Sequence, residues 1–197
     1  MASARSWVTL SIMKKRSNGL TLIEVMIVVG IVGILIALAL PSFSILLVKR
    51  SVQSASQALV DDLRFTRTEA LRRSKKVSIC SLAANSTTAC SGDPAAWANG
   101  WMIFTDEEGA TAGSYDSGSE EIIRVQQPPP NIATIQRPTT PANTRNYFTF
   151  EANGWTKSSS ESLEFTPTSH VSTVTKRLVC VSNQGRPRIL AEGATSC

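Results

Sequence analysis

The apolar residues are concentrated in one uninterrupted segment near the start of the chain. Across residues 20–48 the only charged residue is Glu24. From residue 49 onward an apolar or small side chain recurs every three or four residues, at Val52, Ala55, Leu59, Leu63, Thr66 and Ala70. That spacing places these side chains on one face of a helix. We therefore expect one long helix, apolar over residues 20–48, amphipathic over residues 49–76 and bent at Pro41.

Beyond residue 76 the pattern predicts short strands. Runs rich in apolar and β-branched residues, separated by turn residues, cover residues 77–82, 101–105, 121–125, 147–151, 163–166 and 178–181. Asn153-Gly154 is a strong hairpin-turn signal, and residues 183–185 have the composition of a hairpin tip. Residues 126–141 contain five prolines and are expected to form a loop, because proline cannot donate a hydrogen bond within a sheet. A helix followed by strands predicts an α+β fold, with an antiparallel sheet laid on the helix.

The 197 residues are enough for one compact domain with an appendage. Aromatic side chains of the later part are expected mainly in its core: Trp97, Trp101, Phe104, Phe148, Phe150, Trp155 and Phe165. The single histidine, His170, has no carboxylate near it in the sequence and is expected in an exposed loop. Acidic residues at 106–108 and 120–121 lack the spacing of a calcium-binding loop and are expected to be solvated. The sequence therefore predicts no catalytic residue, metal site or cofactor, and no enzyme.

The net charge of +5 is concentrated at the amino terminus. Residues 1–19 carry four cations and no acid, so the rest of the chain has 16 cations against 15 acids. A basic composition thus gives no argument for a nucleic-acid partner, and only local clusters can do so. Residues 49–76 form one such cluster, with eight cations against three acids. Contact with lipid headgroups or neighbouring subunits is the simpler explanation of this helical cluster.

The apolar segment is long enough to span a membrane, with the preceding cations on the cytoplasmic side. Its order differs from that of a secretory signal, because Ser17-Asn18-Gly19 separates the basic residues from the apolar run, which starts only at Leu20. Simple anchoring leaves Glu24 unexplained, because a carboxylate inside a spanning segment is costly and indicates a function. A positive amino terminus on a neighbouring chain, created by cleavage before Leu20, would be a suitable partner.

Residues 19–25, Gly-Leu-Thr-Leu-Ile-Glu-Val, resemble the class III signal of type IV pilins and type II secretion pseudopilins. The resemblance implies that residues 1–19 are a leader, which prepilin peptidase removes by cutting between Gly19 and Leu20, and that Leu20 is then N-methylated. It also implies that Glu24 pairs with the amino terminus of an adjacent subunit during assembly, and that Pro41 bends the helix. Leucine at position 20 replaces the usual phenylalanine or methionine. A start at Met13 would give a shorter leader of the usual kind.

The resemblance assigns the remaining segments as well. Residues 20–48 would be a hydrophobic transmembrane and assembly helix, and residues 49–197 a globular domain. The protein would cross the inner membrane once before assembly, with its globular part in the periplasm, and later lie in an extracellular pilus. Its partners would be prepilin peptidase, the inner membrane and other major or minor pilins.

Four cysteines, Cys80, Cys90, Cys180 and Cys197, lie in the globular part. They lack the paired spacing of a zinc site. Because the signal directs this part out of the cytoplasm, disulfides are expected. Of the three possible pairings we favour Cys80–Cys90 with Cys180–Cys197, which closes two short loops, each stabilising by about 2–4 kcal/mol.

Gly185-Arg186-Pro187-Arg188 forms a second basic cluster. In an extended segment Arg186 and Arg188 point to the same face, about 7 Å apart, and Pro187 limits backbone freedom. Two guanidinium groups so placed suit neighbouring backbone phosphates, although surface arginines paired with local acids would look the same. This part of the chain also resembles the GspH/FimT family, in which FimT-type members use a Gly-Arg-x-Arg loop to bind DNA.

The family resemblance implies that Gly185, Arg186 and Arg188 contact double-stranded DNA without sequence preference, assisted by Lys176 and Arg177. The predicted function is that of a minor type IV pilin that binds DNA for uptake in natural transformation. Two alternatives stay open from the sequence. The protein could be a structural minor pilin that primes pilus assembly without binding DNA, or a GspH-type pseudopilin of type II secretion.

Overall fold

The computed structural model describes residues 19–107, 111–137, 146–156, 161–170, 172 and 175–197, with the backbone alone for residues 37–42. The chain divides into two compact units, Met1–Leu40 and Pro41–Cys197. Its described helices are α1 (Leu22–Arg73) and the short 3₁₀ helix η1 (Trp97–Asn99). Its described strands are β1 (Val77–Ser81), β2 (Trp101–Thr105), β3 (Ile122–Gln126), β4 (Ile132–Gln136), β5 (Tyr147–Phe150), β6 (Glu161–Pro167), β7 (Arg177–Val181) and β8 (Pro187–Ile189).

The first unit contains the beginning of α1. The hydroxyl oxygen of Thr21 accepts a hydrogen bond from the backbone N–H of Glu24 at 3.4 Å, as an N-terminal cap does. Glu24 lies in the first turn, where the helix dipole favours a negative charge. The large apolar side chains between Leu22 and Ile36 are exposed. Among the residues described, no helix has the length and apolar character needed to cross a membrane. The predicted bend at Pro41 stays a prediction.

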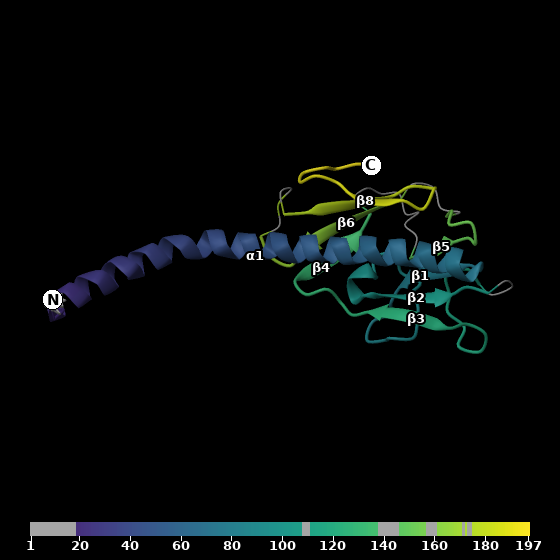
Figure 1. Ribbon diagram of the computed structural model, residues 1–197, viewed down its shortest axis with the longest axis horizontal. Coiled ribbons are helices and arrows are strands. Elements are labelled where there is room, and N and C mark those ends of the chain that lie inside the picture. Colours follow the sequence, from purple (N-terminus) through teal and green to yellow (C-terminus); the bar gives the residue numbers. More distant parts are fainter. Residues whose placement is uncertain (1–18, 108–110, 138–145, 157–160, 171, 173–174) are drawn as a thin grey trace, which may run out of the picture. The chain divides into compact units, whose positions relative to one another are not determined.

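The second unit contains the later part of α1 and two four-stranded antiparallel sheets (Figure 1). The first sheet has the strand order β3-β2-β1-β5, and the second has the order β4-β6-β7-β8. The α+β class and the antiparallel pairing are confirmed. The strands divide between two sheets, where the sequence suggested one. Residues 49–73 supply the helix face that both sheets help to cover.

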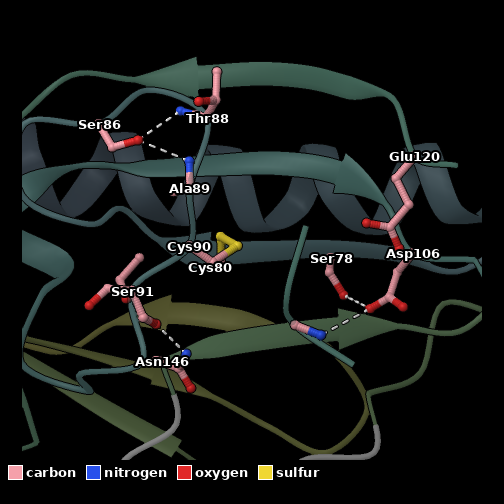
Figure 2. The surroundings of a disulfide bond; sticks show 12 residues. Ser78, Cys80, Ser86, Thr88, Ala89, Cys90, Ser91, Asp106, Glu120 and Asn146 are labelled. Carbon is pink, nitrogen blue, oxygen red and sulfur yellow. Dashed lines mark hydrogen bonds between the residues drawn. A yellow bond between two sulfur atoms is a disulfide. The ribbon is translucent and has the colours of Figure 1, made fainter. Parts of the chain in front are cut away.

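The main core joins this helix face to both sheets. Val52, Leu59 and Leu63 are fully buried, as the three-and-four spacing predicts, and they share one cluster with residues of β1, β2, β4, β5, β6 and β7. A smaller cluster includes Cys80, with Cys90 packed against it. Figure 2 shows the disulfide that joins these two cysteines. Every buried member of both clusters lies at Val52 or later, and both disulfides lie in the same part of the chain. The core of the described residues therefore lies within residues 49–197, called the head below.

The six predicted strands are confirmed to within two residues at each end, but β4 and β8 were not predicted. The expected loop over residues 126–141 is wrong for its middle, because β4 lies within it. β4 is an edge strand, and Pro128–Pro130 precede it, so proline does not interrupt its pairing with β6. Pro138 and Pro141 lie outside the described residues.

Six of the seven aromatic residues expected in the core are buried. The prediction is wrong for Trp155, whose exposed fraction is 53%. Trp155 follows a tight turn in which the Gly154 N–H donates to the Glu151 carbonyl at 2.7 Å, so the position belongs to a surface turn. His170 is exposed in a loop, as expected.

The expectation of a solvated acidic loop is wrong for two carboxylates. Asp106 and Glu120 are buried. Asp106 accepts hydrogen bonds from the Ser78 hydroxyl and from the Gly113 N–H (Figure 2). Glu120 accepts hydrogen bonds from the backbone N–H groups of Asp116 and Glu107, while its burial raises its pKa. Both side chains thus accept hydrogen bonds from nearby polar groups, as buried carboxylates usually do. Glu108 lies outside the described residues.

Candidate nucleic-acid interface

The Gly-Arg-x-Arg segment forms the turn and second strand of the β7–β8 hairpin. Val181 pairs with Pro187, and Cys180 pairs with Arg188. The turn is closed by a hydrogen bond from the Gly185 N–H to the Ser182 carbonyl at 2.8 Å. Residues 183–185 therefore form the predicted hairpin tip.

The two arginines of this hairpin lie on its outer face. Arg186 and Arg188 are exposed, whereas Pro187 between them is buried. This alternation is that of an extended segment, and it agrees with the prediction that both arginines point to the same face. Within the described part of the chain, neither guanidinium group has an ion-pair or hydrogen-bond partner. Both are therefore available to an anion from outside.

Gly185 is required by the packing of two turns. Its φ is +70°, and a Cβ at this position would lie 2.7 Å from the Gly154 carbonyl oxygen and 2.9 Å from a ring carbon of Phe150. The Thr156 N–H donates to the Asn183 carbonyl at 3.2 Å, which ties the same two turns together. The glycine of the motif thus lets the β7–β8 turn approach the turn that contains Gly154.

Lys176 and Arg177 were expected to assist in DNA binding, but in the structure both form ion pairs with carboxylates. Lys176 pairs with Glu164 at 2.8 Å, and Arg177 pairs with Glu192 at 2.8 Å. A phosphate would have to displace these carboxylates before it could bind. Their assisting role stays a prediction, and the structure gives it no geometric support.

Several cations of residues 49–76 also form ion pairs with carboxylates. Arg72 and Arg73 both donate to Glu69, and these hydrogen bonds lower the pKa of Glu69 from 4.5 to about 2. Arg73 also pairs with Glu121, whose pKa it lowers, and Lys75 pairs with Glu107. The helical cluster is therefore largely neutralised near the end of α1.

Two arginines of α1 lie beside the hairpin. They belong to the basic cluster of residues 49–76, but their nearness to the hairpin was not predicted. Arg64 and Arg67 line an open hollow of about 540 Å³ together with Arg186 and its neighbours in the turn. In the sequence the signals were this cluster and their spacing of three, which places two cations side by side on a helix. Nothing in the sequence placed the β7–β8 turn next to them.

Both predicted disulfides are confirmed, Cys80–Cys90 and Cys180–Cys197. The second bond ties the end of the chain to β7, at the residue that pairs with Arg188. It thereby restrains the strand that carries the outer arginine. Over the described residues, no set of three His, Cys, Asp or Glu side chains is placed to hold a metal ion.

Comparison with known families agrees with this architecture. The model of the family described as type II transport protein GspH matches residues 55–185. The chain belongs to the GspH family. The model of the prokaryotic N-terminal methylation motif matches residues 14–40, a range that includes Gly19, Leu20 and Glu24. This GspH-family chain thus carries the amino-terminal motif of type IV pilin-like proteins.

The type IV minor pilin FimU of Pseudomonas aeruginosa has a similar fold. One crystal form of FimU is 19% identical to this chain, with a TM-score of 0.52, covering 75% of this chain and 93% of FimU. A second crystal form is also 19% identical, with a TM-score of 0.47, and covers 73% and 96% of the two chains. No curated protein is similar enough to this chain to count as a match. The likeness to FimU shows the type IV pilin fold alone.

Proposed function

We propose that this GspH-family protein is a minor pilin of a type IV pilus that binds DNA through Arg186 and Arg188. The observation that carries the proposal is the contrast between these arginines and the other cations of the second sheet. Lys176 and Arg177 are neutralised by carboxylates, whereas Arg186 and Arg188 are exposed and have no partner among the described residues. Exposed unpaired guanidinium groups are suited to phosphate oxygens.

The hairpin geometry determines what kind of DNA binding is proposed. Two guanidinium groups on one face of a strand, about 7 Å apart, can contact phosphates but present no surface shaped to a base edge. The restrained backbone of Pro187 lowers the entropy lost on binding. Binding is therefore expected to be independent of sequence, weak for each subunit and strongly dependent on salt. A pilus that retracts would draw the bound duplex toward the cell surface for uptake in natural transformation.

The amino-terminal segment supplies the assembly half of the proposal. Prepilin peptidase would cut between Gly19 and Leu20, Leu20 would be N-methylated, and Glu24 would pair with the new amino terminus of an adjacent subunit. Before assembly the apolar segment would be held in the inner membrane, with the head in the periplasm. The exposed apolar side chains of α1 support this part, because neighbouring pilins would cover them in a filament. The role is structural and needs no cofactor.

The test is a titration of the head with duplex DNA at low and moderate salt. Arg186→Ala/Arg188→Ala is compared with Arg50→Ala/Lys75→Ala, which removes the same charge from exposed positions elsewhere. The first variant is expected to lower the slope of log affinity against log salt by about 1.8 and weaken binding roughly tenfold or more. The control is expected to bind like the unsubstituted head. Absence of binding at low salt, or equal loss in both variants, contradicts the proposal.

A role in type II secretion is the second candidate, because the matching family is described as a type II transport protein. In that case the arginines would face another pseudopilin. Deletion of the gene would then abolish secretion of type II substrates and leave pili and DNA uptake unchanged. The DNA-binding proposal predicts that deletion abolishes DNA uptake and leaves secretion of type II substrates unchanged.

A further inference from the structure

The hollow beside the hairpin extends the basic surface of Arg186 onto α1. One wall consists of helix residues, among them Arg64 and Arg67, and the other is the turn from Gly185 to Pro187. The residues that line it include three arginines and no carboxylate. Such a hollow attracts an anion, because its lining residues include no carboxylate to offset the three positive charges.

The position of Arg67 is fixed by the same close packing that requires Gly185. A Cβ at Gly154 would lie 3.0 Å from the Arg67 Nε atom and 3.3 Å from the Leu71 methyl groups. The turn with Gly154 is therefore held between α1 and the β7–β8 turn. The Arg67 Nε atom is buried, and no described residue accepts its hydrogen bond. The half-buried stem holds the guanidinium group in place and costs little further entropy on binding.

Arg64 is available in a different way. Among the described residues its one ion-pair partner is Asp61, at 3.3 Å, and both side chains are more than half exposed. An ion pair in that setting is worth at most about 1 kcal/mol and exchanges readily for another anion. Arg64 and Arg67 are three residues apart on α1, so their Cβ atoms lie about 5–6 Å from each other. The two side chains therefore place neighbouring positive charges on the same part of α1.

We propose that the DNA path continues from the β7–β8 turn onto α1, where Arg64 and Arg67 bind further phosphates of the same duplex. The inference rests on the proposed function. It enlarges the site from one hairpin to arginines contributed by both α1 and the β7–β8 hairpin. The competing occupant of the hollow is an acidic surface of a neighbouring pilin. DNA is favoured because Arg186, an arginine of the proposed DNA-binding hairpin, is itself one of the residues that line the hollow.

The experiment measures duplex affinity of the head across a range of salt concentrations. Arg64→Gln and Arg67→Gln are each expected to reduce the slope of log affinity against log salt by about 0.9. Each substitution is expected to weaken binding roughly threefold or more, equally for unrelated sequences. Arg50→Gln is the matched control, since Arg50 is an exposed helix arginine about 26 Å along α1 from Arg67. It is expected to change neither the slope nor the affinity.

Arg67→Lys separates a charge contact from a packing role. The lysine variant is expected to recover most of the salt slope that Arg67→Gln loses, while thermal unfolding confirms that both variants fold. Failure of lysine to restore the slope overturns the role of Arg67 as a phosphate contact.

Three further outcomes are decisive. Unchanged binding in Arg64→Gln and Arg67→Gln, with binding lost in Arg186→Ala/Arg188→Ala, overturns the path over α1 and leaves the proposed function standing. If Arg64→Gln and Arg67→Gln bind DNA normally but are no longer incorporated into pili, the hollow contacts a neighbouring pilin and the path over α1 is overturned. No binding by the unsubstituted head overturns the inference and the proposed function together.

Discussion

At the scale of single residues, the glycine and the arginines of Gly185-Arg186-Pro187-Arg188 have different physical roles. Gly185 has a positive φ and lies where any side chain would meet the Gly154 carbonyl and Phe150. Arg186 and Arg188 touch no acid among the described residues and face solvent. The glycine therefore serves the fold of the turn, and the arginines are left for a ligand.

Replacing Gly185 with alanine is expected to lower the free energy of unfolding of the head by about 1–3 kcal/mol. Both the left-handed backbone and the contact with Gly154 would be strained. Arg186→Ala is expected to change the same quantity by no more than about 0.5 kcal/mol, because it is an exposed substitution. Urea denaturation of both variants checks the difference. Equal stability of Gly185→Ala and the unsubstituted head would show that the two turns can separate without cost.

Glu69 makes stability depend on pH. Hydrogen bonds from Arg72 and then Arg73 hold its pKa at about 2 in the folded protein, against 4.5 ordinarily. A lowered pKa contributes stability that is present above pH 4.5 and lost as the pH falls toward 2. The lowered pKa of Glu121 acts in the same direction, whereas the raised pKa of Glu120 acts in the opposite one.

Glu69→Gln is therefore expected to be less stable than the unsubstituted head at pH 7, with the difference shrinking between pH 4.5 and 2. Thermal unfolding measured across this range checks it. The exposed Asp61→Asn substitution serves as the control for loss of a helix carboxylate. A difference that stays constant down to pH 2 would mean that the pKa of Glu69 is not lowered by its arginines.

At the scale of elements, the periodicity of apolar residues predicted those features that depend only on nearby residues in the sequence. The buried face of α1 followed from the spacing of Val52, Leu59 and Leu63, because a helix repeats over a few residues. Strands β4 and β8 could not be predicted in this way. β4 sits between proline-rich segments, and β8 has only three residues, so both depend on pairing with β6 and β7. The division into two sheets is likewise a property of distant contacts.

The same dependence on distant contacts explains which features of the candidate site could be predicted from the sequence. The alternation of Arg186, Pro187 and Arg188 was visible in the sequence because it needs only an extended strand. The partners of Lys176 and Arg177 were not visible, because Glu164 and Glu192 are brought to them by sheet pairing and by the chain after β8. The nearness of Arg67 to the hairpin depends on the packing of α1 against two turns.

A buried polar contact joins α1 to the first sheet. Asp62 accepts hydrogen bonds from the indole N–H of Trp101 at 2.8 Å and from Arg124 at 2.6 Å. The guanidinium group of Arg124 also lies 4.0 Å from the ring centre of Phe65. Asp62 thus holds one strand pair at a fixed position along the helix, while the apolar core supplies most of the attraction.

Asp62→Ala is expected to lower the free energy of unfolding of the head by about 1–3 kcal/mol, because it leaves the fully buried Trp101 N–H without an acceptor. Asp61→Ala, at the neighbouring exposed position, is the matched control and is expected to cost about 0.5 kcal/mol or less. Chemical denaturation checks both variants. Similar values for the two would show that water or another group satisfies Trp101.

At the scale of the whole molecule, the two units suit two separate tasks. The first part of α1 exposes apolar side chains that other subunits would cover, which agrees with the N-terminal methylation motif over residues 14–40. The head has its own core and disulfides and carries the proposed DNA surface. On the proposed function, substitutions in the head are therefore expected to alter DNA binding without altering the assembly contacts of the apolar segment.

The most direct test is NMR mapping of the isotope-labelled head during titration with a short duplex. The proposed function predicts that the backbone amides of the β7–β8 turn and the side-chain N–H signals of Arg186 and Arg188 shift first and furthest. The signals of Arg50 are predicted to stay unchanged, and added salt is predicted to reverse the shifts. Shifts that spare the β7–β8 turn, or that persist at the same affinity in Arg186→Ala/Arg188→Ala, would contradict the claim that this hairpin binds DNA.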